Sequence, residues 1–127
     1  MLLPQDAIFI RGDTIELEFQ LFRNKSTNEY WNLTDNDIRF QLNSSPVVKK
    51  GSENVPGGSN DQISILEASK GQFRVTITKE ESRELSVQDY TYEVEITTDT
   101  GARYTVLQSS LRIVEESIDW EEIESGE

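Results

Sequence analysis

Apolar residues recur at every second position over much of this chain, and this period constrains the fold more than any other feature. Between Ile15 and Leu21 every odd position is apolar, while Glu16, Glu18 and Gln20 fill the even ones. Successive side chains of a β-strand point to opposite faces, so such a run predicts a strand with one face in a core. Further runs that predict strands lie at 38–42, 63–66, 73–77, 90–96 and, less regularly, 104–113.

Turn signals separate these runs at short, regular spacing. The stretch RNKSTNEY (23–30) is short enough for a hairpin-like return, and TDND (34–37) and TDTG (98–101) are further turns. About seven strands with almost no helix predict an all-β protein, and this spacing is typical of an immunoglobulin-like antiparallel β-sandwich. A small closed barrel is the competing all-β architecture.

Length and patterning together predict one domain. A chain of 127 residues can bury a core without disulfides. We expect the sandwich to occupy 1–116 and an acidic C-terminal tail to occupy 117–127. The residues expected in a single core are Phe19, Phe40, Phe73, Tyr92, Val94 and Ile96.

Two local features refine this prediction. Thr78 is expected to cap a single helical turn, with Glu81 three residues on as its capping-box partner. The apolar pattern of the last strand slips by one residue between Leu107 and Ser109. Such a slip indicates a β-bulge, or a strand that changes sheets.

The alternation fails between 44 and 62, where Gly, Pro, Ser and Asn accumulate. This composition predicts a long loop, with at most a brief pairing at Val47 and Val48. Long loops in compact domains are commonly functional or disordered. We therefore expect 49–61 to be the most mobile internal segment, or to be ordered by a partner.

The composition excludes several kinds of chemistry. The chain has no Cys and no His, which rules out disulfides, thiolate catalysis, imidazole metal ligands and Ser-His-Asp triads. The net charge of −12 disfavours nucleic acid and anionic membrane surfaces as partners. The chain shows neither a membrane-spanning run nor the pattern of a secretory signal. No phosphate-binding glycine loop occurs, and no cofactor is expected.

Two short motifs have simpler structural explanations than functional ones. Arg11–Asp13, RGD, would need an exposed loop tip to act as an adhesive ligand, but it directly precedes a long predicted strand. Asp35–Asp37 gathers oxygen ligands of the kind calcium prefers, yet the EF-hand pattern is missing and an Asx-type turn explains it. Carboxylate pairs suited to glycoside hydrolysis arise by chance among 24 acids. We expect neither a metal site nor catalytic residues.

The acidic tail is the most unusual segment. After Val114 the chain carries seven acidic residues and no basic one, with Ile118, Trp120 and Ile123 among them. One interpretation is a solubilising terminus. The other is a peptide whose apolar residues dock on a partner while its charges steer the encounter toward a basic surface. The predicted partner-contact residues are Ile118, Trp120 and Ile123.

The order of the landmarks along the chain resembles a known family. RGDT opens a strand that ends in FQL, WNLT precedes IRFQL, and a Gly-rich loop leads to KGQFRVTIT. YTYEVEITTDTG then ends in a turn, and SSLRIVEE closes the domain. This order, over about 11–116, resembles the N-terminal domain of the phage baseplate upper protein family, an immunoglobulin-like fold of tailed-phage virion proteins.

The resemblance implies a non-enzymatic virion structural protein of a tailed phage, in the tail, baseplate, neck or head decoration. It implies other virion proteins as partners, repeated copies in the particle, and assembly in the host cytoplasm. It also implies that Tyr90, at the start of a strand after a corner, ties that corner by its hydroxyl. The alternative function is a general extracellular or cell-surface module that binds carbohydrate or protein.

Overall fold

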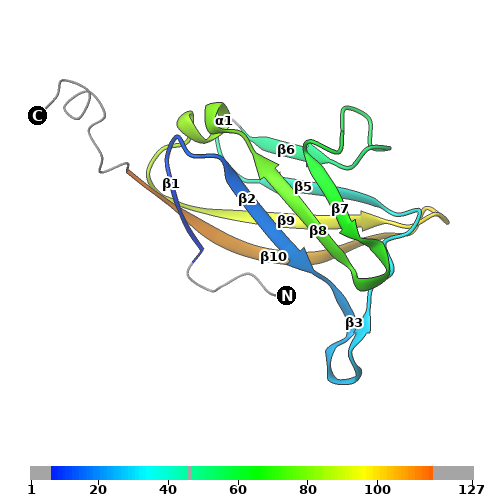
Figure 1. Ribbon diagram of the computed structural model, residues 1–127. Coiled ribbons are helices and arrows are strands. Elements are labelled where there is room, and N and C mark those ends of the chain that lie inside the picture. The colour runs from blue at the N-terminus through cyan, green and yellow to red at the C-terminus, as the bar shows by residue number, and fades with distance from the viewer. Residues whose placement is uncertain (1–6, 46, 116–127) are drawn as a thin grey trace, which may run out of the picture.

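A computed structural model describes residues 7–45 and 47–115, and it shows an all-β sandwich of two packed sheets (Figure 1). The first sheet has the order β1-β10-β9-β5-β6. Its strands are β1 (Ile8–Ile10), β5 (Asp37–Leu42), β6 (Val48–Gly51), β9 (Asp89–Thr97) and β10 (Arg103–Val114). The second sheet has the order β2-β8-β7 and consists of β2 (Ile15–Gln20), β7 (Ile63–Glu67) and β8 (Gln72–Ile77).

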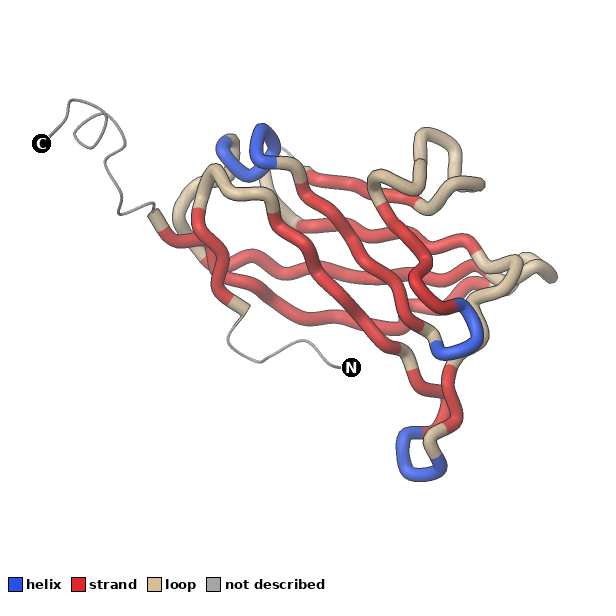
Figure 2. The backbone as a smooth tube through the Cα atoms, in the orientation of Figure 1, coloured by secondary structure: helices blue, strands red, loops and turns tan. Residues whose placement is uncertain are grey.

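A small two-stranded hairpin extends from one end of this body. It consists of β3 (Phe22–Asn24) and β4 (Glu29–Tyr30), joined by the 3-10 turn η1 (Lys25–Thr27). Two other single helical turns, η2 (Ala68–Lys70) and α1 (Lys79–Arg83), lie at strand ends (Figure 2). In Figure 1 the hairpin and α1 lie at opposite ends of the sandwich.

The strand order is that of an immunoglobulin-like sandwich, as the sequence predicted. Neighbouring strands pair antiparallel, except that β1 runs parallel to the end of β10, with Ile8 opposite Arg112 and Ile10 opposite Val114. The strand β1 was not predicted. Its residues Ile8 and Ile10 are 52 % and 40 % exposed, so they show little of the burial that an apolar run suggests.

The predicted core is confirmed, because all six of its residues are buried. Aromatic rings connect the two sheets through this core. Phe19 and Phe73 face each other across β2 and β8 with ring centroids 5.1 Å apart. Tyr92 of the opposite sheet lies 6.0 Å from Phe19 and 5.5 Å from Phe40.

The local predictions for the helical turn and the last strand are also confirmed. Thr78 caps α1, and its hydroxyl accepts a hydrogen bond from the Glu81 N–H while the Glu81 carboxylate accepts one from the Thr78 N–H. The pairing of β10 with β9 shifts by one residue between Thr105 and Leu107. The bulge therefore lies directly before the predicted position.

Two buried tyrosines on β9 differ in how their hydroxyl groups are satisfied. Tyr90 donates a hydrogen bond of 2.9 Å to the Ser86 carbonyl, which is the predicted corner. The Tyr92 hydroxyl has no hydrogen bond of standard geometry within the described residues. Burial raises the pKa of the Tyr92 phenol, and Ser109 opposes this only in part.

This difference predicts opposite effects for the same substitution. Tyr90→Phe removes a satisfied hydrogen bond and should lower the free energy of unfolding by about 1 kcal/mol. Tyr92→Phe removes a desolvated hydroxyl and should leave stability unchanged or raise it by up to about 1 kcal/mol. Urea denaturation of the two variants measures both values. Equal losses in the two variants would contradict this assignment.

The prediction of a structureless loop over 44–62 is wrong in part. Residues 48–51 form β6, and backbone hydrogen bonds join Ser59 to Gly51, and Val55 to Ser52. Val55 is only 9 % exposed, so the segment has an apolar anchor. Gly58 packs so closely that a Cβ there would lie 2.2 Å from the Ser52 carbonyl oxygen. The prediction failed because backbone hydrogen bonds and close backbone contacts stabilise these turns, and such contacts leave no periodic pattern in the sequence.

Gln62 closes this loop from inside. Its side-chain oxygen accepts a hydrogen bond of 3.0 Å from the Gly51 N–H, and its nitrogen donates one of 2.9 Å to the Gly57 carbonyl. Gln62→Ala should therefore speed amide hydrogen exchange at Gly51 by about tenfold or more. This factor corresponds to a loss of about 1.4 kcal/mol in the free energy of local opening. Gln108→Ala is the control, since among the described residues the Gln108 side chain forms a single hydrogen bond, an exposed one of 3.4 Å to Glu93. Unchanged exchange at Gly51 would show that the backbone turns hold the loop alone.

Candidate functional site

The β3–β4 hairpin is held in one conformation by its own polar groups. The Asn24 side chain caps η1 by accepting hydrogen bonds from the Ser26 N–H (3.1 Å) and hydroxyl (2.7 Å). Asn28 then reverses the chain in the left-handed region, at φ 56°, a conformation that Asn tolerates better than most residues. The hairpin is therefore a defined projection rather than a slack connection.

The base of the hairpin is fixed to the second sheet by the backbone at Gly71. The Leu21 N–H donates to the Gly71 carbonyl (2.9 Å), and the Trp31 N–H donates to the Leu21 carbonyl (3.0 Å). Gly71 has φ +65°, and a Cβ there would lie 2.5 Å from the Leu21 oxygen and 2.9 Å from the Trp31 oxygen. Glycine is required at this point because both the dihedral angle and the close approach exclude a side chain.

The candidate site consists of three side chains: Arg23 of β3, Trp31 directly after β4, and Tyr104 of β10. The Trp31 ring meets the Tyr104 ring edge to face, with centroids 5.7 Å apart, and the Arg23 guanidinium lies 5.8 Å from the Trp31 centroid. We call Arg23, Trp31 and Tyr104 the hairpin cluster. Trp31 is half-buried against the core, whereas Tyr104 is 49 % exposed.

The hairpin carries a second aromatic pair on its other face. Phe22 and Tyr30 are opposite each other in the register, and their ring centroids are 5.1 Å apart. Alternation along a strand places Phe22 and Arg23 on opposite faces of the ribbon. The two pairs are therefore separate surfaces, and Phe22 with Tyr30 serves as an internal comparison for the hairpin cluster.

The hairpin also carries positive charge that the described residues do not neutralise. Arg23 and Lys25 are exposed, and neither forms an ion pair with an acid in 7–45 or 47–115. They are two of the six Lys and Arg residues that form no ion pair within 7–45 and 47–115, on a chain whose net charge is −12. Exposed aromatic rings and Arg are the residue types that dominate the energy of protein interfaces.

A groove of about 450 Å³ lies on the outer face of the first sheet, beside the loop that Gln62 closes. The residues that line it include Arg39, Gln41, Lys49, Gly57, Gly58, Glu93 and Glu95. Within the groove Glu95 lies 4.0 Å from Arg39, and it also lies 3.4 Å from Arg103 outside it. The groove therefore carries basic and acidic side chains together and favours neither sign of charge in a ligand.

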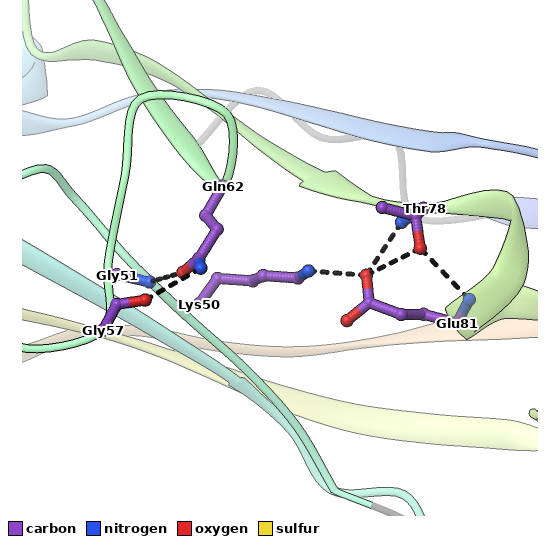
Figure 3. A network of polar contacts seen from close by, with 6 residues as sticks. All are labelled: Lys50, Gly51, Gly57, Gln62, Thr78 and Glu81. Carbon is purple, nitrogen blue, oxygen red and sulfur yellow. Dashed lines mark hydrogen bonds and ion pairs between the residues drawn. The ribbon is translucent and has the colours of Figure 1, made fainter.

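A buried ion pair connects β6 to α1 next to this groove (Figure 3). Lys50 Nζ lies 2.5 Å from a carboxylate oxygen of Glu81, and the Lys50 side chain is only 6 % exposed. Burial raises the pKa of the Glu81 carboxyl, but the hydrogen bonds from Lys50 and from the Thr78 backbone outweigh it and hold that pKa below 4.5. This pair fastens the corner before β9 to the edge of the first sheet, a structural task.

The structure places the sequence motifs as follows. Arg11–Asp13 forms the turn from β1 to β2, closed by a hydrogen bond of 3.1 Å from the Asp13 N–H to the Ile10 carbonyl. Asp35 occupies the left-handed region at φ 59°, within the predicted turn. The described residues contain no group of three or more acids that could hold a metal ion. The predicted contact residues Ile118, Trp120 and Ile123 lie outside the described residues.

The hairpin cluster was not predicted from the sequence. The stretch 23–30 was expected to be a turn, and Trp31 appeared only as part of the WNLT landmark of the family resemblance. Trp31 and Tyr104 are 73 positions apart, so no local pattern brings them together. The usable signal was the unusual density of aromatic and basic residues in 22–31 of an acidic chain.

Comparison with known proteins adds no family to this description. Within the described part of the chain, no helix is long and apolar enough to cross a membrane. No protein-family model matches this chain, and no curated protein matches it either. The resemblance to the baseplate upper protein family therefore stays a prediction.

Proposed function

We propose that this chain is a non-enzymatic structural protein of a tailed-phage virion, which acts through protein–protein contacts in the tail, baseplate, neck or head decoration. The observation that carries the proposal is the hairpin cluster. It presents Arg23 of the hairpin and Tyr104 of β10 to solvent, and among the described residues neither Arg23 nor the nearby Lys25 forms an ion pair. Aromatic side chains lose little conformational entropy on binding, and aromatic residues and Arg are enriched among the residues that dominate the energy of protein interfaces.

Two further observations support this assignment. The fold is an immunoglobulin-like sandwich, which is the fold that the family resemblance implies. The acidic surface, with a net charge of −12, repels phosphate backbones and favours protein partners over nucleic acid. We propose that the component is assembled in the host cytoplasm and retained in the particle, as the family resemblance implies.

Mass spectrometry of phage particles tests this function. Particles from a lysate that expresses this chain are banded in a density gradient, and peptides of the chain are counted relative to those of the major capsid protein. We expect the chain to band with the particles at a fixed copy number after a high-salt wash. Its recovery only in the soluble fraction or on the host surface would refute a virion role and favour the alternative, an extracellular or cell-surface binding module.

A further inference from the structure

We propose that the hairpin cluster of one copy binds the acidic segment 117–127 of a second copy, so that copies of this chain associate head to tail. The inference rests on the proposed function, because a virion protein present in repeated copies has neighbouring copies available for such a contact. It deepens that function by naming the two surfaces that bind each other. One is the hairpin cluster of Arg23, Trp31 and Tyr104, and the other is the segment around Trp120.

Charge complementarity is the first argument. The described residues leave Arg23 and Lys25 without an acidic partner, although the chain has twice as many acids as bases. The segment 117–127 contains five acids and no base. An exposed cation attracts such an acidic segment from another copy, and salt screens this attraction.

Aromatic complementarity is the second argument. Tyr104 is 49 % exposed, and its ring already meets Trp31 edge to face. Another ring can extend this arrangement, since aromatic rings prefer edge-to-face or offset contacts. Trp120 is the only Trp, Tyr or Phe in the acidic segment, and Ile118 and Ile123 flank it. The segment therefore supplies one aromatic anchor with apolar support.

Chain length decides between the same copy and a second copy. Tyr104 and Val114 lie near opposite ends of β10, so ten residues at about 3.3 Å each separate them by roughly 33 Å. Six residues lead from Val114 to Trp120, and they span at most about 22 Å when fully extended. The Trp120 Cα thus falls roughly 11 Å short of the Tyr104 Cα of its own copy, even for a chain that doubles straight back at Val114. A contact within one copy would need both side chains stretched toward each other, whereas a second copy meets no such constraint, and we assign the contact to a second copy.

The geometry also sets the kind of assembly. The receiving surface lies at the hairpin end of the sandwich, whereas β10 ends on the other side of the molecule (Figure 1). Two different surfaces in contact form a heterologous interface, which builds rings or open arrays rather than a closed symmetric pair. Each copy then offers one hairpin cluster and one acidic segment.

Sedimentation velocity of the full chain, over a concentration series, tests the proposal. We expect association that weakens as salt rises from 50 to 500 mM. Trp120→Ala should weaken association about 30-fold or more, the scale of an interface anchor. Arg23→Glu with Tyr104→Ala should do the same. A wild-type chain that stays monomeric at 200 μM overturns the proposal, whatever the particle experiment shows.

Matched controls separate this contact from general effects. Tyr30→Ala removes an aromatic ring from the other face of the same hairpin and should leave association unchanged. Lys79→Glu, at the opposite end of the sandwich, makes the same charge change as Arg23→Glu and should also leave it unchanged. A loss of association in these controls equal to that in the test variants overturns the assignment of the surface.

Mixing the two kinds of variant gives the sharpest test. The Arg23→Glu/Tyr104→Ala copy keeps its segment, and the Trp120→Ala copy keeps its hairpin cluster. Each should be monomeric alone, and an equal mixture should form dimers that grow no further. If Trp120→Ala instead lowers the Tm of the monomer and leaves association intact, Trp120 packs on its own copy and the proposal is wrong.

Discussion

Phe73→Ala is expected to lower the free energy of unfolding by about 3–5 kcal/mol, more than any of the other substitutions. Phe73 is fully buried on the central strand of the second sheet and stacks on Phe19 at 5.1 Å. Removing its ring opens a cavity at the junction of the two sheets, where neighbouring strands cannot close in because both are paired. For a domain of this size the Tm should fall by roughly 15 °C.

Phe22→Ala is the matched control for this prediction. It deletes the same side chain from the hairpin, where Phe22 is half-buried and contacts Tyr30 at 5.1 Å. We expect a loss of about 1 kcal/mol, since the site is open to solvent on one side. Thermal and urea denaturation give both values. Similar losses for Phe73 and Phe22 would mean that the aromatic cluster is not the centre of the core.

Glu81→Gln should have the second-largest effect, a loss of about 2 kcal/mol at pH 7. The substitution keeps a capping-box residue for α1 but leaves the Lys50 ammonium, 6 % exposed, without its carboxylate. Breaking a fully buried pair costs about 3–5 kcal/mol. The expected loss is smaller because Glu81 itself is 36 % exposed and water can reach that end of the pair.

The pH dependence of this effect has a definite sign. The folded-state pKa of Glu81 lies below its ordinary value of 4.5, so the pair contributes stability above pH 4.5 and loses it as the pH falls through the lowered pKa. The stability difference between wild type and Glu81→Gln should therefore be largest at pH 7 and should shrink as the pH falls below 4.5. A difference that stays constant from pH 7 to pH 3 would show that charge is not its origin.

Two further variants complete the experiment. Glu16→Gln removes a carboxylate that is 55 % exposed and lies 3.5 Å from Arg74, and it should change stability by less than about 0.5 kcal/mol. Lys50→Met combined with Glu81→Gln should recover most of the loss, because the buried charge is then gone. Failure of the double variant to recover would point to the cap of α1 rather than to the ion pair.

Several features could be predicted from the sequence because their causes are local. The alternation in 15–21 and 90–96 indicates which side chains are buried, since one face of each strand packs on the core and the other faces water. The capping box at Thr78 depends on two residues in one turn. Tyr90 was placed by its position after a corner, and its hydroxyl does bond to Ser86, four residues earlier. In each case the interacting groups are neighbours in the chain.

The candidate site could not be predicted in the same way. Trp31 and Tyr104 meet only because the hairpin and β10 reach the same end of the sandwich, and their separation in the chain leaves no pattern. The backbone of Gly71 sets the position of the hairpin, through contacts with Leu21 and Trp31 that depend on the packing of both strands. The acidic segment, in contrast, could be identified from composition alone. The hairpin cluster, which we propose as its binding surface, could not.

By itself, the sequence determined the all-β class, the core residues and the exclusion of His and Cys chemistry, because periodicity and composition are properties of single segments. Only the tertiary structure decided that 48–51 is a strand. Lys50 interrupts the apolar alternation there, and its burial is tolerable only because Glu81, 31 residues away, supplies a carboxylate at 2.5 Å. Whether a buried charge destabilises the fold depends on the partner that lies next to it in space. A partner so distant in the chain cannot be identified from the local sequence pattern.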